Sequence, residues 1–367
     1  MSFDFTALRA IGWPFEGLPQ PGRWATAIAD HPEGRPARVV EQHRSGYIVS
    51  EGSGQGFAVE SLPDWQRPRL APEARPAVGD WLLISGEAGH NARAVALLPR
   101  RSTIKRAVAG EHYGQQVIAA NIDTVFIVCG LDGDFNPRRI ERYLLLVRGG
   151  AQPVVVLTKA DADGGLDGPN ATEARALASE LEAQGVPVFA INAKQRESVA
   201  MLHRWLGPGN TAVVVGSSGA GKSTLTNTLL GRQHMKTGAV RKNDARGRHT
   251  TTHRALITLP SGACLIDTPG MRELKPTGEE DLTETSFADL DTLADRCRFR
   301  DCQHQQEPGC ALRAAVAAGR LDAARLDHYL KLHHEIAGAA DRQLQQAETK
   351  AKGKPSKRRP GAARRRR

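Results

Sequence analysis

The chain has 367 residues, 40% of them hydrophobic, and a net charge of +10 at pH 7. This length suffices for two or three domains with separate cores, and the absence of a long uncharged apolar run excludes a membrane-spanning protein. Residues 350–367 contain ten Lys and Arg and no acid, which equals the whole net charge, so the rest of the chain is neutral overall. The first residues lack the basic start and apolar core of a signal peptide, so we expect a cytoplasmic protein without membrane contact.

Residues 1–35 are rich in Pro, Gly and Trp, and we expect an irregular or partly ordered N-terminal arm. From residue 37 the pattern changes to short runs with β character, which turn residues separate about every ten positions. These runs predict a small β-barrel or sandwich with strands at 38–41, 47–50, 56–59, 80–85 and 93–98.

Basic residues exceed acidic ones in this β region. Residues 35–106 contain eleven Lys and Arg against seven Asp and Glu, with Arg100-Arg101 and Lys105-Arg106 at its end. A small five-stranded barrel with a basic edge is a common nucleic-acid platform. The alternative is an ordinary solvated face, and the sequence leaves both interpretations open.

From residue 121 onward, apolar runs alternate with longer helical patterns. Strand-like runs lie at 124–129, 153–157, 186–191 and 211–215, and helical patterns lie between them at 137–147, 172–182 and 196–205. This alternation predicts a mostly parallel sheet with helices on both faces. Ligands of such sheets bind beyond the carboxyl ends of the strands. Two cysteines inside strand-like runs, Cys129 and Cys264, are expected to be buried.

The most informative stretch is Gly216-Ser217-Ser218-Gly219-Ala220-Gly221-Lys222-Ser223, between the apolar run 211–215 and a helical pattern at 223–230. This is G-x-x-x-x-G-K-S in the strand, loop and helix context of a nucleoside triphosphate-binding phosphate loop. Glycines let backbone N–H groups turn toward an oxyanion, and the helix presents its positive end to it. We expect Lys222 to reach the β- and γ-phosphates and the Ser223 hydroxyl to bind Mg²⁺.

A candidate base-recognition motif, Thr158-Lys159-Ala160-Asp161, follows the apolar run 153–157. The Asp161 carboxylate can accept from both N1–H and the 2-amino group of guanine, whereas adenine offers no such pair of donors. The stem of Lys159 can lie along the ring. After the next strand, Asn192-Ala193-Lys194 stands where a backbone N–H can reach guanine O6. Together with the phosphate loop, these segments predict a guanine nucleotide site.

Asp267-Thr268-Pro269-Gly270 follows the apolar run 263–266. We expect Asp267 to hold Mg²⁺ through water and the Gly270 N–H to meet the γ-phosphate, so that the segment changes shape when that phosphate leaves. The polar stretch 246–252 suits a mobile loop, from which Thr251 would complete the Mg²⁺ shell.

The residue after Gly270 is Met271, which has no group that can orient an attacking water. Ras-like GTPases hold a glutamine at this place, so a catalytic group must come from elsewhere in the chain or from a partner. Our hypothesis is His249, because it lies in the mobile loop. The alternative is that His249 is a solvated or partner-contacting histidine.

The order of the motifs is base site, phosphate loop and then switch segments, which rotates the usual GTPase order. A sheet can be closed from new termini because domain ends usually lie close together. The sequence therefore predicts a circularly permuted GTPase, in which the segment after Gly270 leads straight into the C-terminal part.

Three thiols and one imidazole lie within fourteen residues, at Cys297, Cys302, His304 and Cys310. This ligand set matches a closed tetrahedral structural zinc site, and in a reducing compartment metal is favoured over a disulfide. Pro308-Gly309 supplies a turn before the last ligand. Three neighbouring arginines suit phosphate contacts, namely Arg296, Arg298 and Arg300.

A helical pattern covers 312–334, with His333 and His334 expected on its surface. The segment 348–367 that follows is basic, interrupted by Pro and Gly, and without apolar anchors. This composition predicts a disordered tail that binds polyanions in a salt-dependent way. The alternative is a tail that only improves solubility.

With these motifs, the chain resembles the RsgA (YjeQ) family of circularly permuted GTPases, which act in small-ribosomal-subunit biogenesis. The resemblance covers about residues 36–335 and includes Leu98-Pro99-Arg100-Arg101-Ser102 and Asp134-Phe135-Asn136. Its other segments are 116–123, 158–161, 216–223, 247–252, 267–270 and 297–310. The long Arg-rich tail is not an expected feature of the family.

The resemblance implies a multidomain protein that hydrolyses GTP, is stimulated by the small (30S) ribosomal subunit, and contacts 16S rRNA through both flanking domains. Its expected parts are an N-terminal arm at 1–35, an OB-fold β-barrel at 36–112, a circularly permuted α/β P-loop GTPase domain at 113–277, a C-terminal α-helical zinc-binding domain at 278–343 and a disordered basic tail at 344–367. We expect a monomer that uses one structural Zn²⁺, and Mg²⁺ with GTP.

The candidate nucleotide-binding residues are the positions that match the family's motifs together with the positions inferred from the chemistry of the residues. They comprise Thr158, Lys159, Ala160, Asp161, Asn192, Ala193, Lys194, Gly216, Ser217, Ser218, Gly219, Ala220, Gly221, Lys222, Ser223, Thr224, Thr251, Asp267 and Gly270. Among and beside them, the catalytic candidates are Lys222 and His249, and the Mg²⁺ ligands are Ser223 and Asp267. Thr158 replaces the asparagine common in GTPases, which we expect to weaken base contacts slightly.

Two functional hypotheses follow. The leading one is an enzyme, a slow GTPase that the 30S particle activates and that uses hydrolysis to leave it. The other is an RNA-binding assembly factor for which GTP is chiefly an affinity switch. Action on transfer RNA or at a membrane is disfavoured by the neutral body and the lack of apolar anchors.

Overall fold

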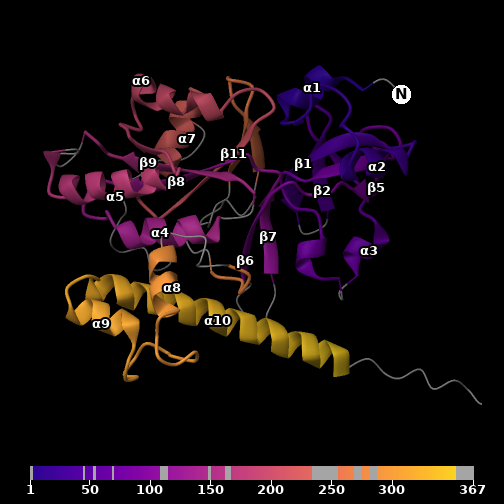
Figure 1. Cartoon of the computed structure of the whole chain (residues 1–367). Helices are drawn as coiled ribbons and strands as arrows, with labels where there is room; N and C mark the ends of the chain where they lie inside the picture. The colour runs from indigo at the N-terminus through magenta and orange to yellow at the C-terminus, as the bar shows by residue number, and fades with distance from the viewer. Residues whose placement is uncertain are drawn as a thin grey trace, which may run out of the picture.

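The computed structural model shows a β-rich N-terminal part, a central α/β part and a helical C-terminal part (Figure 1). It describes residues 3–43, 46–52, 55–67, 70–107, 115–147, 150–161, 167–233, 255–267, 275–280 and 287–352. Within these ranges, no helix combines the length and the apolar character needed to cross a bilayer.

The N-terminal arm is folded, which corrects the expectation of an irregular segment. It forms helices α1 (Phe5–Ala10) and α2 (Arg23–Ala29). Between them, Trp13 is fully buried, and its ring centroid lies 5.3 Å from that of Trp24 and 4.8 Å from that of Trp81. The tryptophans bury enough apolar area to order a Pro- and Gly-rich segment against the next domain.

The predicted strands of the barrel are confirmed. They are β1 (Arg35–His43), β2 (Gly46–Ser50), β3 (Phe57–Val59), β4 (Trp81–Ser85) and β5 (Arg93–Leu97). Antiparallel pairing joins β1 to both β2 and β4, β2 to β3, and β4 to β5. A parallel bridge between Glu60 and Arg93 connects the two free edges, so the five strands close on themselves. Two short helical segments lie between β3 and β4, α3 (Pro63–Gln66) and a 3₁₀ turn (Pro72–Ala74).

The central sheet has the predicted parallel strands, β8 (Thr124–Gly130), β9 (Gln152–Thr158), β10 (Val188–Ala190), β11 (Thr211–Gly216) and β13 (Cys264–Asp267). Their order is β10-β9-β8-β11-β13, and the antiparallel strand β12 (Ala255–Thr258) joins β13 to β1 of the barrel. Cys129 and Cys264 are buried within these strands as expected, and burial raises the pKa of both thiols.

Helices cover both faces of the central sheet, as the alternation predicts. The face that includes Ile127 packs against α4 (Pro137–Leu146) and α5 (Ala171–Ala183). The face that includes Phe126 packs against α6 (Arg196–Val199), the 3₁₀ helix Ala200–Trp205 and α7 (Lys222–Leu230). Neighbouring residues of a strand point to opposite faces, so one buried strand serves two cores.

A hairpin of β6 (Thr103–Ala107) and β7 (Gln115–Ala120), which sequence patterns did not predict, connects the barrel to the central sheet. Its strands lie on either side of residue 112, where we placed a domain boundary, and that boundary stays a prediction.

The C-terminal part consists of α8 (Ala288–Ala294), α9 (Ala311–Ala317) and α10 (Ala323–Lys352). The helical pattern at 312–334 is therefore two helices, and the break contains Gly319 at φ 67°. His333 and His334 are exposed, as expected. Helix α10 continues to Lys352, which corrects the prediction of disorder from residue 344, because the strong helix formers Ala, Gln, Glu and Lys predominate there. The remaining tail lies outside the described residues.

Helix α10 packs beneath α4 of the central domain (Figure 1). His328 Nδ1 lies 3.1 Å from Glu141 Oε2, and Arg142 Nη1 lies 2.7 Å from Glu335 Oε2. Leu145 of α4 belongs to the same apolar cluster as Leu326 and Phe287. The central and C-terminal parts therefore share both apolar and ionic contacts.

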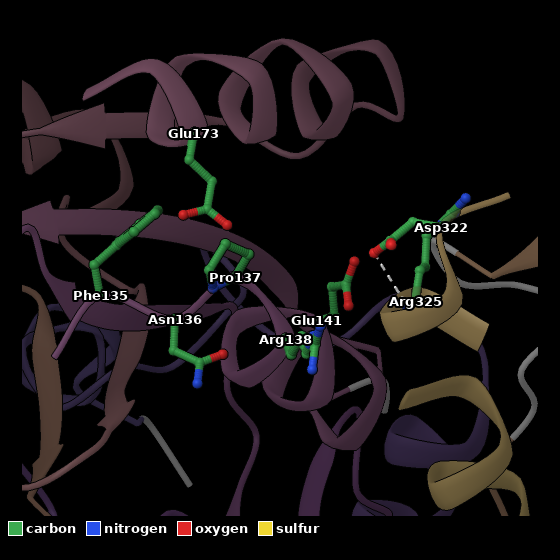
Figure 2. Close-up of a pocket in the computed structure, with 8 residues that line it drawn as sticks. All are labelled: Phe135, Asn136, Pro137, Arg138, Glu141, Glu173, Asp322 and Arg325. Carbon is green, nitrogen blue, oxygen red and sulfur yellow. Dashed lines mark hydrogen bonds between the residues drawn. The ribbon is translucent and has the colours of Figure 1, made fainter. Parts of the chain in front are cut away.

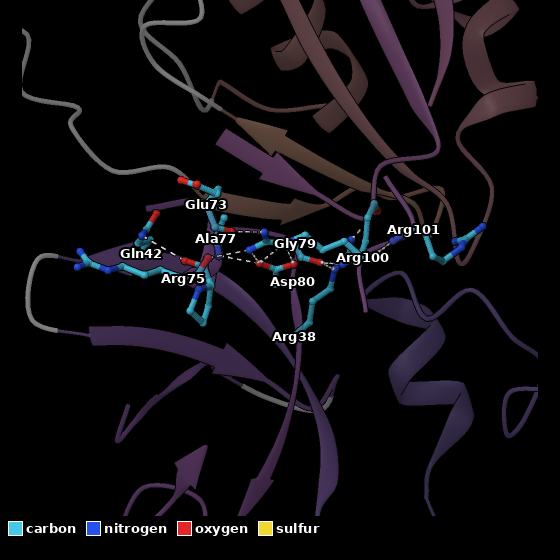
Figure 3. A network of polar contacts seen from close by, with 11 residues as sticks. Arg38, Gln42, Glu73, Arg75, Ala77, Gly79, Asp80, Arg100 and Arg101 are labelled. Atoms are coloured by element: carbon cyan, nitrogen blue, oxygen red, sulfur yellow. Dashed lines mark hydrogen bonds and ion pairs between the residues drawn. The ribbon is translucent and has the colours of Figure 1, made fainter. Parts of the chain in front are cut away.

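The expected basic edge of the barrel is largely engaged in internal pairs (Figure 3). Arg100 makes a two-pronged contact with buried Asp80, with Nη2 to Oδ2 at 2.7 Å, and Arg101 Nη1 lies 3.3 Å from Asp123 Oδ1. Burial raises the pKa of Asp80, and the Arg100 ion pair opposes that rise. Lys105 pairs with Glu279 at 2.8 Å. These cations therefore stabilise the domain junction, which weakens the interpretation of this edge as a nucleic-acid platform.

Arg38 of β1 is a fully buried cation at the same junction. Its guanidinium donates to the backbone carbonyls of Ile11 at 2.6 Å and Asn121 at 3.1 Å, and to Thr211 Oγ1 at 2.8 Å. It thereby connects the N-terminal arm, the barrel and the start of β11. Burial lowers the pKa of Arg38, yet a guanidinium stays charged in proteins, and its hydrogen bonds offset the desolvation.

Candidate nucleotide and metal sites

The predicted nucleotide motifs gather at the carboxyl edge of the central sheet. The motif at 158–161 begins at the last residue of β9, and the motif at 192–194 follows β10. The phosphate loop begins at the last residue of β11, and Asp267 is the last residue of β13. The chain runs from β8 outward to β10 and then returns on the other side of β8 as β11. This change of direction is a topological switch point, where open α/β sheets bind ligands.

The phosphate loop requires its glycines for steric reasons. A Cβ on Gly216, whose φ is 145°, would lie 2.2 Å from the Val128 carbonyl oxygen, and one on Gly221, at φ 91°, would lie 3.0 Å from Thr158 Oγ1. Lys222 begins α7, and its Nζ donates to the Gly216 carbonyl at 2.8 Å, so the ammonium lies over the loop. The loop thus places a lysine and a helix N-terminus at the centre of the edge, an arrangement suited to a phosphate.

Residues expected to bind Mg²⁺ lie on neighbouring elements. Ser223 is in the first turn of α7, and Asp267 is the last residue of β13, which pairs with β11 in parallel. Both side chains are partly exposed. A hydroxyl and a carboxylate beside the phosphate loop are oxygen ligands of the kind that Mg²⁺ prefers.

Thr158 links the base-recognition motif to the phosphate loop. It is fully buried, and its Oγ1 donates to the Ala220 carbonyl at 2.6 Å. The substitution for the common asparagine therefore does not remove polar contact between the two segments. Lys159, which follows, has φ 59°, a left-handed conformation that is unusual for a non-glycine residue.

The segment 192–194 is fixed by its own side chains and by α7. Ser198 Oγ accepts from the Asn192 N–H at 2.9 Å, Asn192 Oδ1 accepts from the Lys194 N–H at 2.9 Å, and Thr228 of α7 donates to the Ala193 carbonyl at 2.6 Å. Of the three backbone N–H groups in the segment, that of Ala193 has no partner among the described residues. Three predicted site residues, His249, Thr251 and Gly270, lie outside the described residues.

The predicted metal ligands come together in the C-terminal part. The ligand atoms of Cys297, Cys302, His304 and Cys310 all lie within 4.8 Å of one another. His304 Nδ1 is 3.5 Å from both Cys297 Sγ and Cys310 Sγ, and these two sulfurs are 4.0 Å apart. A tetrahedral zinc with Zn–S bonds of about 2.3 Å places its sulfurs about 3.8 Å apart, so the cluster fits the ion.

The surrounding backbone supports this cluster. Gly309 has φ 80°, which allows the predicted turn before Cys310. The Ala311 N–H donates to Cys297 Sγ at 3.3 Å, which stabilises a thiolate. Burial, with the charge of His333, lowers the pKa of His304 and so favours the neutral imidazole that metals bind.

Sequence patterns did not indicate the pocket in Figure 2, which lies between the starts of α4, α5 and α10. Its volume is about 430 Å³, and it is lined by Phe135, Asn136, Pro137, Arg138, Glu141, Glu173, Asp322 and Arg325. Glu141 pairs with His328, and Arg325 pairs with Asp289 at 2.8 Å. Since Glu141 and Arg325 are paired in this way and no charged residue of the groove belongs to a predicted motif, we regard the carboxyl edge, and not this groove, as the reactive site.

A phosphate loop on a parallel sheet, with its base motif earlier in the chain and Asp267 after it, defines the chain as a circularly permuted P-loop GTPase. The family model for RsgA GTPase matches residues 97–277. A model for ABC transporters also matches residues 202–353, a range that includes the phosphate loop.

Comparison with known proteins identifies the family. The small ribosomal subunit biogenesis GTPase RsgA of Xanthomonas axonopodis pv. citri is 62% identical over 360 residues, which cover 98% of this chain and 96% of that protein. The protein of the same name from Xanthomonas oryzae pv. oryzae is 61% identical over 363 residues, covering 99% and 97%. The chain belongs to the RsgA GTPase family, and it is an enzyme that hydrolyses GTP.

Solved structures agree with the fold. YloQ, a circularly permuted GTPase, has a TM-score of 0.55 at 23% identity, covering 85% of this chain and 97% of its own. YjeQ from Thermotoga maritima has a TM-score of 0.56 at 23% identity, covering 83% and 99%. The circularly permuted GTPase fold predicted from motif order is thereby confirmed.

Proposed function

We propose that this GTPase binds the small (30S) ribosomal subunit and couples GTP hydrolysis to late subunit maturation and to its own release. The observation that carries the proposal is the 62% identity to a small ribosomal subunit biogenesis GTPase, which extends over 98% of this chain and so includes both flanking parts. Such a partner also accounts for the cytoplasmic location that we propose.

The nucleotide-binding residues are those of the carboxyl edge. Asp161 accepts from guanine N1–H and the 2-amino group, the Ala193 N–H donates to O6, and the loop 216–223 binds the phosphates. Ser223 and Asp267 hold Mg²⁺, with Thr251 completing the shell and Gly270 meeting the γ-phosphate. Two observations support this assignment: the Ala193 N–H has no partner in the described part of the chain, and the Lys222 ammonium lies over the phosphate loop.

Catalysis uses Lys222 to stabilise charge on the transferred phosphoryl group, and His249 to orient the attacking water when the subunit is bound. Met271 offers no such group, so hydrolysis is slow without the partner. Stimulation by the small subunit follows, because water is oriented for attack only when the subunit is bound.

The zinc cluster is structural, because three thiolates and an imidazole fill a tetrahedral shell and leave no open position. Its ligands are Cys297, Cys302, His304 and Cys310. The ion would fix the loop between α8 and α9, which carries the exposed residues Arg296, Arg298 and Arg300.

We place the rRNA contacts of the C-terminal part on the zinc loop. Arg296, Arg298 and Arg300 are exposed, and none of them pairs with an acid among the described residues. Phe299 is 42% exposed, and the Arg298 guanidinium lies 5.6 Å from its ring centroid. An exposed aromatic ring with unpaired guanidinium groups suits stacking on an unpaired base and contact with phosphates.

The N-terminal part would contribute a second RNA contact as an OB-fold barrel, away from the edge at which Arg100 and Arg101 form internal ion pairs. Its strand circuit β1-β2-β3-β5-β4 supports this proposal. The division at 1–35, 36–112, 113–277 and 278–343 is part of the same proposal, with the last part extended to Lys352 by α10. So is a monomeric state in which the basic tail beyond α10 adds salt-dependent affinity.

The test is GTP hydrolysis measured alone, with purified 30S subunits and with 50S subunits, using ATP as the control nucleotide. We expect strong stimulation by 30S only, and equal rates in all three conditions would refute the proposal. In the alternative function, GTP is an affinity switch and turnover is incidental. Lys222→Ala tests the premise that both functions share, because normal binding and release of subunits by this variant would show that the nucleotide does not control the cycle.

A further inference from the structure

The loop that follows β8 contacts the base-recognition motif, although no motif in the sequence assigns it to the nucleotide site. Asp132 Oδ2 forms an ion pair with Lys159 Nζ. The Lys159 side chain is 30% exposed and that of Asp132 is 23% exposed, so the pair is partly shielded from water. The contact joins the ends of two adjacent strands, β8 and β9, at the ligand-binding edge.

The backbone around Asp132 is held in place by neighbouring elements. The Leu131 N–H donates to the Thr158 carbonyl at 2.9 Å. The Asn170 side chain, at the start of α5, donates to the carbonyls of Leu131 at 3.1 Å and Asp132 at 2.9 Å. The carboxylate is therefore presented to Lys159 from a fixed position, and little side-chain entropy is lost when the pair forms.

The space for the lysine stem depends on Gly130. A Cβ at this position would lie 2.6 Å from Asp132 Oδ1 and 3.3 Å from both Cε and Nζ of Lys159. Lys159 itself has φ 59°. Gly130 and the fixed Asp132 carboxylate thus both restrict where the Lys159 side chain can lie. The left-handed backbone of Lys159 is strained, and backbone strain of this kind is typical of functional sites.

The contribution of Asp132 to folding stability does not explain why a carboxylate stands at this position. Asp132 Oδ1 is buried and accepts no hydrogen bond in the described part of the chain, so half of its acceptor capacity is unused. A buried carboxylate oxygen without a donor is unfavourable for folding. Its persistence beside Lys159 indicates a role in placing that ammonium.

We propose that Asp132 is a positioning residue for guanine nucleotide binding, which holds Lys159 so that its aliphatic stem forms one wall of the base site. This inference rests on the proposed assignment of 158–161 as the base motif. Asp161 reads the edge of the base, whereas Asp132 acts through the lysine on the ring face. The effect of Asp132 is therefore independent of the 2-amino group.

The experiment measures dissociation constants of GDP, IDP and ADP by titration calorimetry on the full chain. Asp132→Asn keeps the shape and removes the charge, and we expect it to weaken GDP and IDP equally, by about three- to tenfold. In Lys159→Met, which we expect to weaken both at least as much, adding Asp132→Asn should change nothing further. Asp134→Asn, an exposed aspartate in the same loop, is the matched control and should bind like the wild type.

Equal binding of GDP by Asp132→Asn and wild type, no effect of Lys159→Met, or full additivity of the two changes would overturn the proposal. Gly130→Ala serves as a second variant, in which the added Cβ separates Asp132 from Lys159 sterically, and it should likewise weaken GDP and IDP equally. Thermal midpoints report whether each variant is folded. If the wild type binds GDP no better than ADP, the base-site assignment itself is wrong, an outcome distinct from failure of the Asp132 inference.

Discussion

Replacement of Thr158 by valine removes one hydroxyl between the base motif and the phosphate loop while keeping the shape of the side chain. In the wild type, Oγ1 donates to the Ala220 carbonyl at 2.6 Å, and Thr158 is fully buried. Valine fills the same space, so no cavity forms, but the Ala220 carbonyl, in a residue only 1% exposed, loses its donor. Leaving a buried acceptor unpaired costs about 1–3 kcal/mol.

We expect this loss to loosen the phosphate loop and to raise the dissociation constant of GDP. A change of about 1 to 2 kcal/mol corresponds to about 5- to 30-fold in affinity. Titration calorimetry at saturating Mg²⁺ measures the effect. Thr158→Ser is the control, because it keeps the hydroxyl and removes only a methyl group, so it should bind nearly as the wild type does while melting at a lower temperature. Wild-type affinity in Thr158→Val would refute the reasoning.

Three further outcomes are expected. Gly216→Ala should abolish nucleotide binding, since its Cβ would lie 2.2 Å from the Val128 carbonyl oxygen, whereas Gly133→Ala, which meets nothing within 4 Å, should bind GDP normally. Metal analysis should find one zinc per chain, and its removal by a chelator should lower the melting temperature and helix content, so an unchanged metal-free protein would exclude a structural zinc. Arg298→Ala should weaken binding to 30S subunits and reduce its salt slope by about one, while Arg101→Ala, whose partner is Asp123, should leave the slope unchanged.

Local patterns sufficed to predict the central domain. Parallel strands buried on both faces are continuous apolar runs, and the phosphate loop is a contiguous motif whose geometry its glycines determine. The order of the motifs along the chain was also enough to identify the circular permutation. The metal cluster could also be predicted from the sequence, because its four ligands lie within fourteen residues.

Contacts between distant segments were not predictable in this way. The N-terminal arm folds because Trp13 packs on Trp81, 68 positions later, a contact that composition does not reveal. Arg100 belongs to a basic cluster in the sequence, but in the structure it pairs with Asp80. The role inferred for Asp132 likewise depends on a contact with Lys159, 27 residues away in the chain.

The most direct test of the base-site assignment is the nucleotide preference of wild type and Asp161→Asn, measured by titration calorimetry with GDP, XDP and ADP. We expect the wild type to prefer GDP over ADP by at least about 100-fold, because the carboxylate pairs with two donors that adenine lacks. In Asp161→Asn the amide donates to the 2-oxo group of xanthine, so XDP should become the preferred ligand. An Asp161→Asn protein that still binds GDP as tightly as the wild type and does not gain affinity for XDP would contradict the placement of guanine at this edge.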